Sequence, residues 1–293
     1  MLVTDLDNTL YDWVDVWHRS FAAMFDELVR HTDGPRELLL DEIRAVHRAH
    51  GTSEYAFLAE ELPSVARLGE RASRAIESVN DARRRARDNS LRLYPGVAHT
   101  LRALQARGVL VIGYTESMAF YSAARVRKLG LDGLLDLLYS PADHELPRGL
   151  TREQVRRHPG AHYEFRHTVH RHTPPGELKP NPGLLLDILA DAGAEPGDAV
   201  YVGDSPMKDI AMARDAGVAD ALALYGRAQD REGYELLRRV THWTQEDVER
   251  ERRILERREI SASYVLRDSF AELTELFSFT SFAGKASLQA ASA

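Results

Sequence analysis

The sequence predicts an α/β protein, in which a parallel sheet is interrupted by a helical domain. From residue 92 onward, short apolar runs of strand length alternate with helical patterns, the order that builds a parallel sheet. Between the first apolar run, at residues 2–4, and the next lie about 75 residues of helical pattern, too many for an ordinary crossover. We therefore expect one sheet domain with a large helical insertion.

Composition describes an ordinary folded chain of 293 residues, with 44% hydrophobic and 28% charged residues. The net charge of −7 gives no support to nucleic-acid binding. Cysteine is absent, which excludes disulfides, thiol catalysis and cysteine-based zinc sites and fits a cytosolic protein. No apolar run reaches about 18 residues and no leader pattern is visible, so we expect a cytoplasmic protein without a membrane partner.

The first strand ends in two acidic residues, Asp5 and Asp7. Parallel sheets hold their active sites at the carboxyl ends of strands, where Asp5 is expected to lie. Asp5 and Asp7 are two positions apart, so on a nearly extended backbone they share one side. Two close carboxylates repel each other, which favours a bound cation or a shared proton, and magnesium prefers oxygen ligands. For this pattern alone, a turn with surface acids is the alternative.

Residues 13–91 read as an inserted helical domain. Trp17, Phe21 and Leu28 belong to the apolar stripe of a first helix, a second helix is expected after Pro35, and a third over residues 65–82. The polar turn between the second and third helices holds His50 and Tyr55. These two side chains are candidates for choosing the substrate, and an ordinary inter-helix turn is the alternative interpretation.

Four further strands are predicted, at residues 109–114, 134–139, 199–203 and 221–224. Helices are expected to follow most of these strands, for example at residues 184–191. The sheet domain then comprises residues 1–12 and 92–280, with residues 264–266 and 270–276 closing the core. A charged helical elaboration is expected at residues 227–258, strongest at 246–258, and a mobile tail at 281–293.

Residues 141–176 interrupt this pattern with a segment rich in Pro, Arg and His. His158 and His162 have the spacing of two zinc ligands on a helix, but Pro159-Gly160 between them argues against that helix. A metal-binding or nucleic-acid-binding module is an alternative for this segment, but the acidic net charge and the lack of interleaved aromatic residues argue against it. We interpret it as a polar lid, whose cations would attract anionic substrates.

Polar residues follow the predicted strands at three places, and a lysine stands in a turn at a fourth. Asp5 and Asp7 follow the first strand, Thr115 and Glu116 the second, and Asp204 and Asp209 the fourth, while Lys179 stands in a turn before Pro180. Together these residues resemble, in order, the four motifs of the haloacid dehalogenase (HAD) superfamily. The first is DxDx(T/V), matched by residues 5–9, and the last is GDxxxxD, matched by residues 203–209.

This resemblance implies a Rossmann-like sheet of strand order 3-2-1-4-5, and a cap domain at residues 13–91 of the kind called C1. It implies that Asp5 is the nucleophile, that Asp7 is the general acid and base, and that Thr115 and Lys179 bind the phosphoryl group. Magnesium would be held by Asp5, Asp204 and the backbone carbonyl of Asp7, with Asp209 supporting it. Glu116 departs from the Asn or Asp often seen at that place.

The expected activity is hydrolysis of a small phosphorylated metabolite: a nucleotide monophosphate, a sugar phosphate or a phosphoglycolate-like compound. Asp7 argues against haloacid dehalogenation, because those enzymes resemble this chain but lack a carboxylate at that place. A phosphomutase and a non-catalytic binding protein of the same fold are the alternatives. The oligomeric state is left open.

Overall fold

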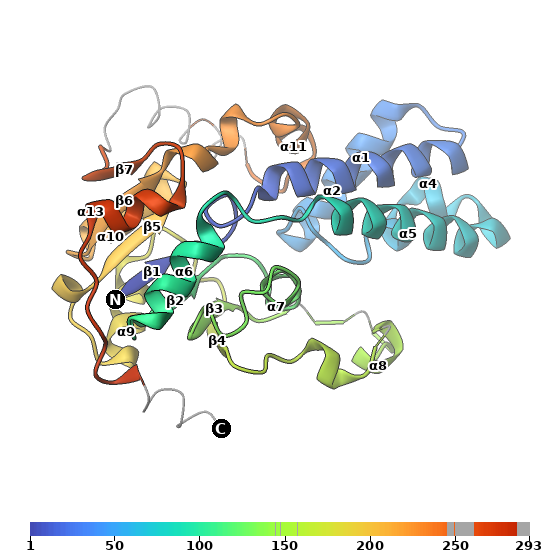
Figure 1. Cartoon of the computed structure of the whole chain (residues 1–293). Helices are drawn as coiled ribbons and strands as arrows, with labels where there is room; N and C mark the ends of the chain where they lie inside the picture. The colour runs from blue at the N-terminus through green and yellow to red at the C-terminus, as the bar shows by residue number, and fades with distance from the viewer. Residues whose placement is uncertain (144, 147, 157, 245–248, 250–260, 286–293) are drawn as a thin grey trace. The chain divides into compact units, whose positions relative to one another are not determined.

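The computed structural model describes residues 1–143, 145–146, 148–156, 158–244, 249 and 261–285 (Figure 1). Contacts between residues divide the chain into two compact units. We call Met1–Tyr11, Arg92–Arg227 and Arg258–Ala293 the sheet unit. The second, which we call the helical unit, comprises Asp12–Leu91 and Ala228–Arg257.

The sheet has seven strands within the described residues, in the order β4-β3-β2-β1-β5-β6-β7, and every neighbouring pair is parallel. The predicted α/β class is confirmed. The five central strands follow the predicted order, and β4 and β7 extend the sheet at its two edges. The strands are β1 (Leu2–Thr4), β2 (Val111–Tyr114), β3 (Leu137–Pro141), β4 (Val169–Thr173), β5 (Val200–Gly203), β6 (Ala219–Ala223) and β7 (Tyr264–Leu266).

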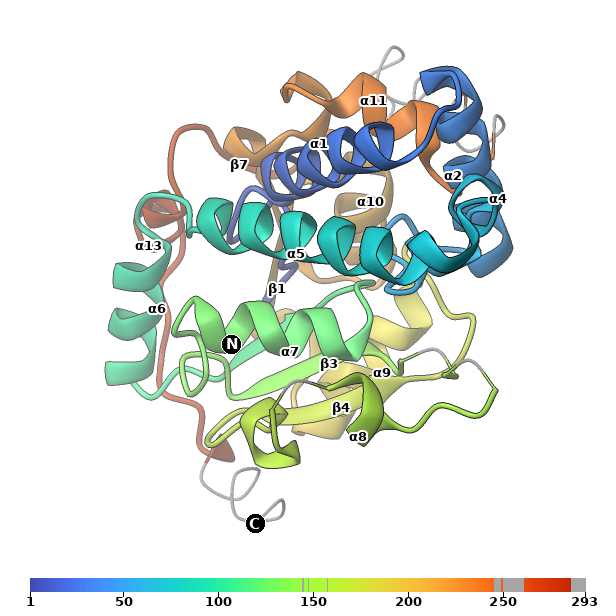
Figure 2. The ribbon, with the colours of Figure 1, turned by 90° about the vertical axis from the view of Figure 1, so that its right-hand side faces the viewer.

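Both faces of the central strands are buried because helices cover them (Figure 2). Residues such as Val3 and Ile112 pack against the apolar side of α9, including Leu185 and Ile188, in one buried cluster. Alternate residues such as Gly113 face the other side, where Leu6 and Leu138 leave no room for a larger side chain. The helices of this unit are α6 (Val97–Ala106), α7 (Ala119–Lys128), α8 (Arg152–Val155), α9 (Pro182–Ala192), α10 (Ala211–Asp215) and α13 (Leu273–Leu276).

Short helical turns complete the sheet unit: η2 (Gly160–Tyr163), η3 (Pro196–Asp198), the π-helical η4 (Pro206–Ile210), η5 (Leu224–Gly226) and η7 (Phe270–Glu272). The predicted closing segments at 264–266 and 270–276 correspond to β7, η7 and α13. The predicted strand at 134–139 is displaced, since β3 runs from Leu137 to Pro141.

The interpretation of residues 141–176 as a lid is wrong for part of that segment. Val169–Thr173 forms the edge strand β4, which pairs with β3 over five residues. The backbone makes this pairing, for example from Val169 N to Asp136 O at 2.9 Å, so the side chains need not be apolar. An edge strand tolerates the sequence Val-His-Arg-His-Thr, whose first four residues are exposed or half-buried, which is why the apolar pattern missed it.

The first residues of the predicted mobile tail, 281–293, make contacts with the sheet unit. Phe282 donates its backbone N–H to Gly108 O at 2.9 Å, and Lys285 donates to Val109 O at 2.7 Å. Lys285 also lies 3.0 Å from Asp136 Oδ2, which is buried. These contacts attach residues 282–285 to the start of β2, and residues 286–293 lie outside the described part of the chain.

The helical unit consists of α1 (Trp13–His31), α2 (Arg36–His50), α3 (Leu58–Glu61), α4 (Pro63–Ala66), η1 (Gly69–Arg71), α5 (Ala72–Ser90), η6 (Ala228–Asp230) and α11 (Tyr234–Val240). Asp12 caps α1 by accepting from Asp15 N at 2.9 Å, and Gly51 ends α2 in the left-handed region. The stripe predicted on α1 is buried: Trp17 stacks on Phe21 at 4.8 Å between ring centroids.

Residues 227–258 were predicted as an elaboration of the sheet domain, but the described residues 228–244 belong to the helical unit. Leu237 and Val240 of α11 are fully buried in the same apolar cluster as α1 and α2. Val240 O also accepts from His47 Nδ1 of α2 at 2.7 Å. The helical unit is therefore assembled from two segments that are distant in the chain, and α11 adds Leu237 and Val240 to the apolar cluster of the first segment. The helix predicted at 246–258 falls almost wholly outside the described residues.

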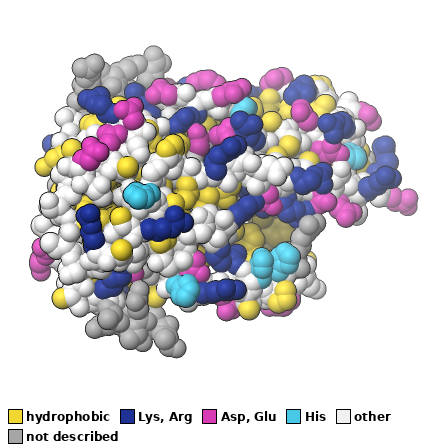
Figure 3. Space-filling view, viewed as in Figure 1, with side chains coloured by type: hydrophobic (Ala, Val, Ile, Leu, Met, Phe, Trp, Pro, Cys, Tyr) yellow, Lys and Arg dark blue, Asp and Glu magenta, His cyan; other side chains and the backbone are white. Residues whose placement is uncertain are grey.

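The surface carries both signs of charge. On the face in Figure 3, Lys and Arg side chains are interspersed with Asp and Glu, rather than gathered into one basic region. Within the described residues, no helix combines the length and the apolar character needed to cross a membrane.

Candidate active site

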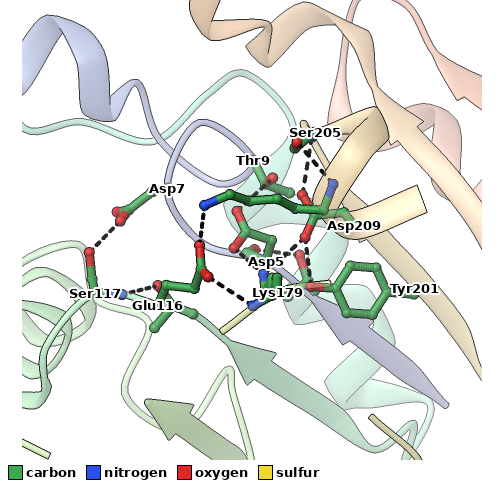
Figure 4. A network of polar contacts seen from close by, with 12 residues as sticks. Asp5, Asp7, Thr9, Glu116, Ser117, Lys179, Tyr201, Ser205 and Asp209 are labelled. Carbon is green, nitrogen blue, oxygen red and sulfur yellow. Dashed lines mark hydrogen bonds and ion pairs between the residues drawn. The ribbon is translucent and has the colours of Figure 1, made fainter. Parts of the chain in front are cut away.

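Polar residues converge where β1 ends in the middle of the sheet. β1 lies between β2 and β5, and Asp5 N donates to Val202 O of β5 at 2.8 Å. The residues that follow these three strands therefore meet at one edge, as Figure 4 shows for Asp5, Glu116 and Asp209. Room for the turn after β1 comes from Gly226, since a Cβ there would lie 1.6 Å from Asn8 O.

Asp5 is almost completely buried, with 7% of its surface exposed. Its Oδ1 accepts from Lys179 Nζ at 2.7 Å, and its Oδ2 accepts from Thr9 Oγ1 at 3.1 Å. Burial raises the pKa of Asp5 to about 7; Lys179 opposes this rise, and the negative charges of Asp209 and Asp7 add to it.

Lys179 joins two carboxylates. Its Nζ donates to Asp5 Oδ1 and, at 2.9 Å, to Asp209 Oδ1, and its side chain is only 2% exposed. The ammonium also lies 4.7 Å from the ring centroid of Tyr114 and 5.4 Å from that of Tyr201. Burial alone would lower the pKa of Lys179, but Asp209 and Asp5 outweigh it and raise that pKa well above its ordinary value. The side chain is therefore a fixed positive charge beside Asp5.

Asp209 is held from three sides. Oδ1 accepts from Lys179 and from Tyr201 OH at 2.9 Å, and Oδ2 accepts from Ser205 N at 3.1 Å. Gly203 makes this approach sterically feasible, because a Cβ there would lie 2.3 Å from Asp209 Cγ. These contacts fix the π-helical turn that follows β5.

Three carboxylates form a cluster suited to a cation. Asp5, Asp204 and Asp209 each offer an oxygen, and these oxygens all lie within 4.8 Å of one another. Burial, followed by the charges of Asp209 and Asp5, raises the pKa of Asp204 well above its ordinary value. Among the described residues this is the single group of three or more acidic, His or Cys side chains with such spacing, so neither His158 nor His162 belongs to one.

Asp7 lies beside this cluster with different partners. Its Oδ2 accepts from Ser117 Oγ, and its Oδ1 accepts from Tyr11 OH and, at 3.3 Å, from Arg125 NH1. Arg125 also donates to Ser117 Oγ at 3.0 Å and is 3% exposed. A buried guanidinium thus compensates the charge of Asp7.

The turn after β2 contains Thr115 and Glu116. Thr115 is buried, its N–H donates to Tyr139 O at 3.0 Å, and its Oγ1 accepts from Ser117 N at 3.1 Å. Glu116 accepts from Lys179 N at 2.8 Å and from Lys208 Nζ at 2.5 Å. Burial would lower the pKa of Lys208, but the Glu116 carboxylate outweighs it, so the net shift is upward.

His50 and Tyr55, predicted from the polar turn, belong to the helical unit and contact each other there. Their rings stack at 3.6 Å between centroids, and both donate toward Glu61, Tyr55 OH at 2.6 Å and His50 Nε2 at 2.8 Å. Tyr55 is 6% exposed. Within the helical unit, these contacts join the end of α2 and the turn after it to Glu61 of α3.

Several polar side chains of the site escaped the sequence reasoning: Thr9, Ser117, Arg125, Tyr201, Ser205 and Lys208. Thr9 stands at the last position of the first motif and could have been recognised there. Tyr201 is two positions before Gly203 on a strand and therefore shares its face, which is a detectable signal. The sequence contains no signal for the burial of Arg125, because an arginine in a predicted helix is usually solvated.

Comparison with known proteins gives a family match. A family model described as haloacid dehalogenase-like hydrolase matches residues 1–217. Phosphoglycolate phosphatase 1 of Pseudomonas aeruginosa is 46% identical over 50 residues, which cover 17% of this chain and 18% of that protein. The match thus spans less than one-fifth of the curated relative.

Two solved structures resemble the chain over most of its length. The HAD phosphatase of Thermococcus onnurineus has a TM-score of 0.52 at 18% identity, covering 96% of this chain and 99% of that one. The 2-haloacid dehalogenase of Pseudomonas syringae pv. Tomato has a TM-score of 0.51 at 20% identity, with 94% and 96% covered. At such identities these likenesses concern the fold, whereas the family model covers most of the sequence. The chain belongs to the haloacid dehalogenase-like hydrolases.

Proposed function

We propose that this protein is a magnesium-dependent phosphatase that hydrolyses a small phosphorylated metabolite through an aspartyl-phosphate on Asp5. The observation that carries the proposal is the position of Asp5, buried at the end of β1 with Lys179 Nζ 2.7 Å away and Asp204 and Asp209 within reach. A carboxylate nucleophile attacks an anionic phosphate ester only where positive charge is already concentrated.

A divalent cation fits the charges of the acidic cluster. Asp5, Asp204 and Asp209 carry three negative charges when ionised, and Lys179 supplies one positive charge. The remaining two negative charges are costly in a buried site and would be neutralised by one divalent ion. Carboxylate oxygens are the ligands that magnesium prefers. In the proposal Asp5, Asp204 and the backbone carbonyl of Asp7 would hold the ion, and Asp209 would support it.

The first step is transfer of the phosphoryl group to Asp5. A carboxylate oxygen of Asp5 attacks phosphorus while the bond from phosphorus to the substrate oxygen breaks. Lys179 balances the charge of the phosphoryl oxygens, and Thr115 contributes a hydroxyl that positions them. Magnesium, when bound, would supply further positive charge at these oxygens.

Asp7 is proposed to move the protons. It would protonate the departing alcohol and then take a proton from the water that hydrolyses the aspartyl-phosphate. Its present contacts with Ser117, Tyr11 and Arg125 hold the carboxylate at the edge of the site. This role distinguishes a phosphatase from a dehalogenase, whose halide leaves without a proton.

Selection among substrates is assigned to residues outside the sheet core. The phosphoryl group is common to nucleotide monophosphates, sugar phosphates and phosphoglycolate-like compounds, so the residues that bind it cannot choose among them. The helical unit, including His50 and Tyr55, is the proposed selector, with the described part of 141–176 as a second one. The short likeness to a phosphoglycolate phosphatase favours beginning with a two-carbon phosphate.

The decisive experiment measures release of inorganic phosphate from para-nitrophenyl phosphate with and without magnesium, followed by a screen of the three substrate classes. Hydrolysis that depends on magnesium supports the proposal. Transfer of the phosphoryl group to a sugar hydroxyl, rather than to water, would identify a phosphomutase. Absence of turnover with every compound would identify a non-catalytic binding protein.

A further inference from the structure

The ion pair between Glu116 and Lys208 joins two loops that are not neighbours in the sheet. Glu116 follows β2 and Lys208 lies in η4 after β5, while β1 with Asp5 lies between these strands. The two loops are therefore about 10 Å apart at the level of the strands, twice the usual interstrand spacing. The two side chains bridge this gap at the end of the sheet where Asp5 lies, and Lys208 Nζ donates to Glu116 Oε2 at 2.5 Å.

Lysine is unusual in this chain. Of its 38 basic residues only four are lysines, Lys128, Lys179, Lys208 and Lys285, and two of the four are at this site. An ammonium is a compact charge on a flexible stem, whereas a guanidinium prefers a fixed planar partner. A lysine at position 208 therefore suits a cation that changes its partner.

The ion pair is partly exposed, unlike the buried ion pairs of Lys179. The Lys208 side chain is 36% exposed and that of Glu116 is 23% exposed, in contrast with 2% for Lys179. Partly exposed ion pairs contribute less stability than well-buried ones, so a competing anion can separate these two charges. A phosphate group offers more charge and more acceptor oxygens than a carboxylate does, and it would compete effectively for the ammonium.

We propose that Lys208 is a second phosphate-binding cation, which Glu116 holds until the substrate arrives. On binding, Lys208 Nζ leaves Glu116 and donates to the phosphoryl group. Glu116 keeps its second contact, in which Oε1 accepts from Lys179 N at 2.8 Å, so the loop that carries Lys179 stays in place. This inference rests on the proposed function for the identity of the ligand, and it adds a residue that sets the affinity for phosphate.

The test measures binding of inorganic phosphate by calorimetry, with magnesium present, in the wild type and in Lys208→Met, Glu116→Gln and the double variant. Lys208→Met should weaken binding at least about tenfold, as loss of one charged contact does. Glu116→Gln should strengthen binding, because its amide oxygen still accepts from Lys179 N while the competing charge is gone. Lys128→Met, which removes an exposed lysine of α7, is the matched control and should leave binding unchanged.

The comparison that decides the matter is Glu116→Gln against the double variant. If Lys208 binds phosphate, the double variant binds at least about tenfold more weakly than Glu116→Gln. Equal affinities would overturn the proposal, since Lys208 would then only neutralise Glu116. Weaker binding in both single variants would also overturn it, because the pair would then serve only to join the loops.

A wild type that fails to bind phosphate contradicts the inference, whereas a wild type that binds phosphate without hydrolysing esters contradicts only the proposed function. Circular dichroism checks folding, and Lys208→Gln replaces Lys208→Met if the latter is unfolded.

Discussion

Lys179 Nζ lies 2.7 Å from Asp5 Oδ1, although the two residues are 174 positions apart in the chain. This contact brings together the turn after β1 and the turn before α9, two segments that no local interaction would join. The same ammonium binds Asp209 at 2.9 Å, so one buried positive charge serves two buried carboxylates.

Replacing Asp5 by Asn should abolish phosphatase activity and leave the fold intact. The amide cannot attack phosphorus, and we expect kcat/KM to fall at least about 1000-fold, or about 4 kcal/mol of barrier. Lys179 retains Asp209 as a partner, so the melting temperature should stay close to that of the wild type. Activity within about tenfold of the wild type would exclude Asp5 as the nucleophile.

Replacing Lys179 by Met should reduce stability as well as activity. Without its ammonium, Asp5 and Asp209 face each other as uncompensated buried charges, and loss of one partner of such a pair typically costs about 3 kcal/mol or more. Saturating magnesium should restore part of this loss, because it neutralises the same carboxylates. Denaturant titration with and without magnesium measures the difference, with Lys128→Met as the control. An equal loss under both conditions would contradict a cation site at this cluster.

Activity should require magnesium and disappear on chelation. Calcium should inhibit rather than replace magnesium, since its larger and more variable coordination shell lets a carboxylate bind through both oxygens and misaligns the attack. Assays after dialysis against a chelator, with each metal then restored singly, provide the measurement. Full turnover in excess chelator by protein found free of metal would argue against the assignment.

The helical unit should lose stability as the pH falls from about 6.5 toward 4. Burial lowers the pKa of His47 to about 4, and its Nε2 has no hydrogen-bond partner among the described residues. The unfolded chain binds a proton near pH 6.5 while the folded chain does not, so protonation favours unfolding by up to about 3 kcal/mol at the acid end of this range. Thermal melting at several pH values measures this effect. His47→Asn should show a shallower pH dependence, and an unchanged slope would exclude His47 as its source.

His50→Ala and Tyr55→Phe should change the ranking of substrates more than the rate with a small aryl phosphate. The relevant quantity is the ratio of kcat/KM between the best metabolite and para-nitrophenyl phosphate. Both side chains contact Glu61, so the variants also test a structural role. A parallel decrease with both substrates, accompanied by a lower melting temperature, would indicate that these residues only stabilise the helical unit.

The central strands and the acidic residues that follow them could be predicted from the sequence, because the physical signal is local. β1, β2 and β5 are buried on both faces, which requires continuous apolar runs, and Asp5 and Asp204 stand directly after two of them. Lys179 was placed only by resemblance to a family. Nothing around it in the sequence shows that its side chain is 2% exposed.

Other features depend on partners that are distant in the chain. Val169–Thr173 reads as polar, and it becomes a strand because β3 offers it a free edge. Arg125 can be buried because Asp7 lies opposite it, and the sequence around either residue does not indicate this pairing. The apolar stripe of α11 predicts a buried face without indicating which unit buries it.

The composition of the helical unit has a consequence for synthesis of the protein. Leu237 and Val240 complete an apolar cluster that begins with Trp17. Because synthesis proceeds from the N-terminus, the first 91 residues emerge from the ribosome before α11 has been made. At usual rates of translation the delay is about 7 to 30 s. During this time α1 and α2 expose apolar surface that α11 later covers, which makes the nascent chain a candidate for chaperone binding. Residues 13–91 expressed alone should therefore aggregate, and a fragment joined to residues 228–244 should be more soluble.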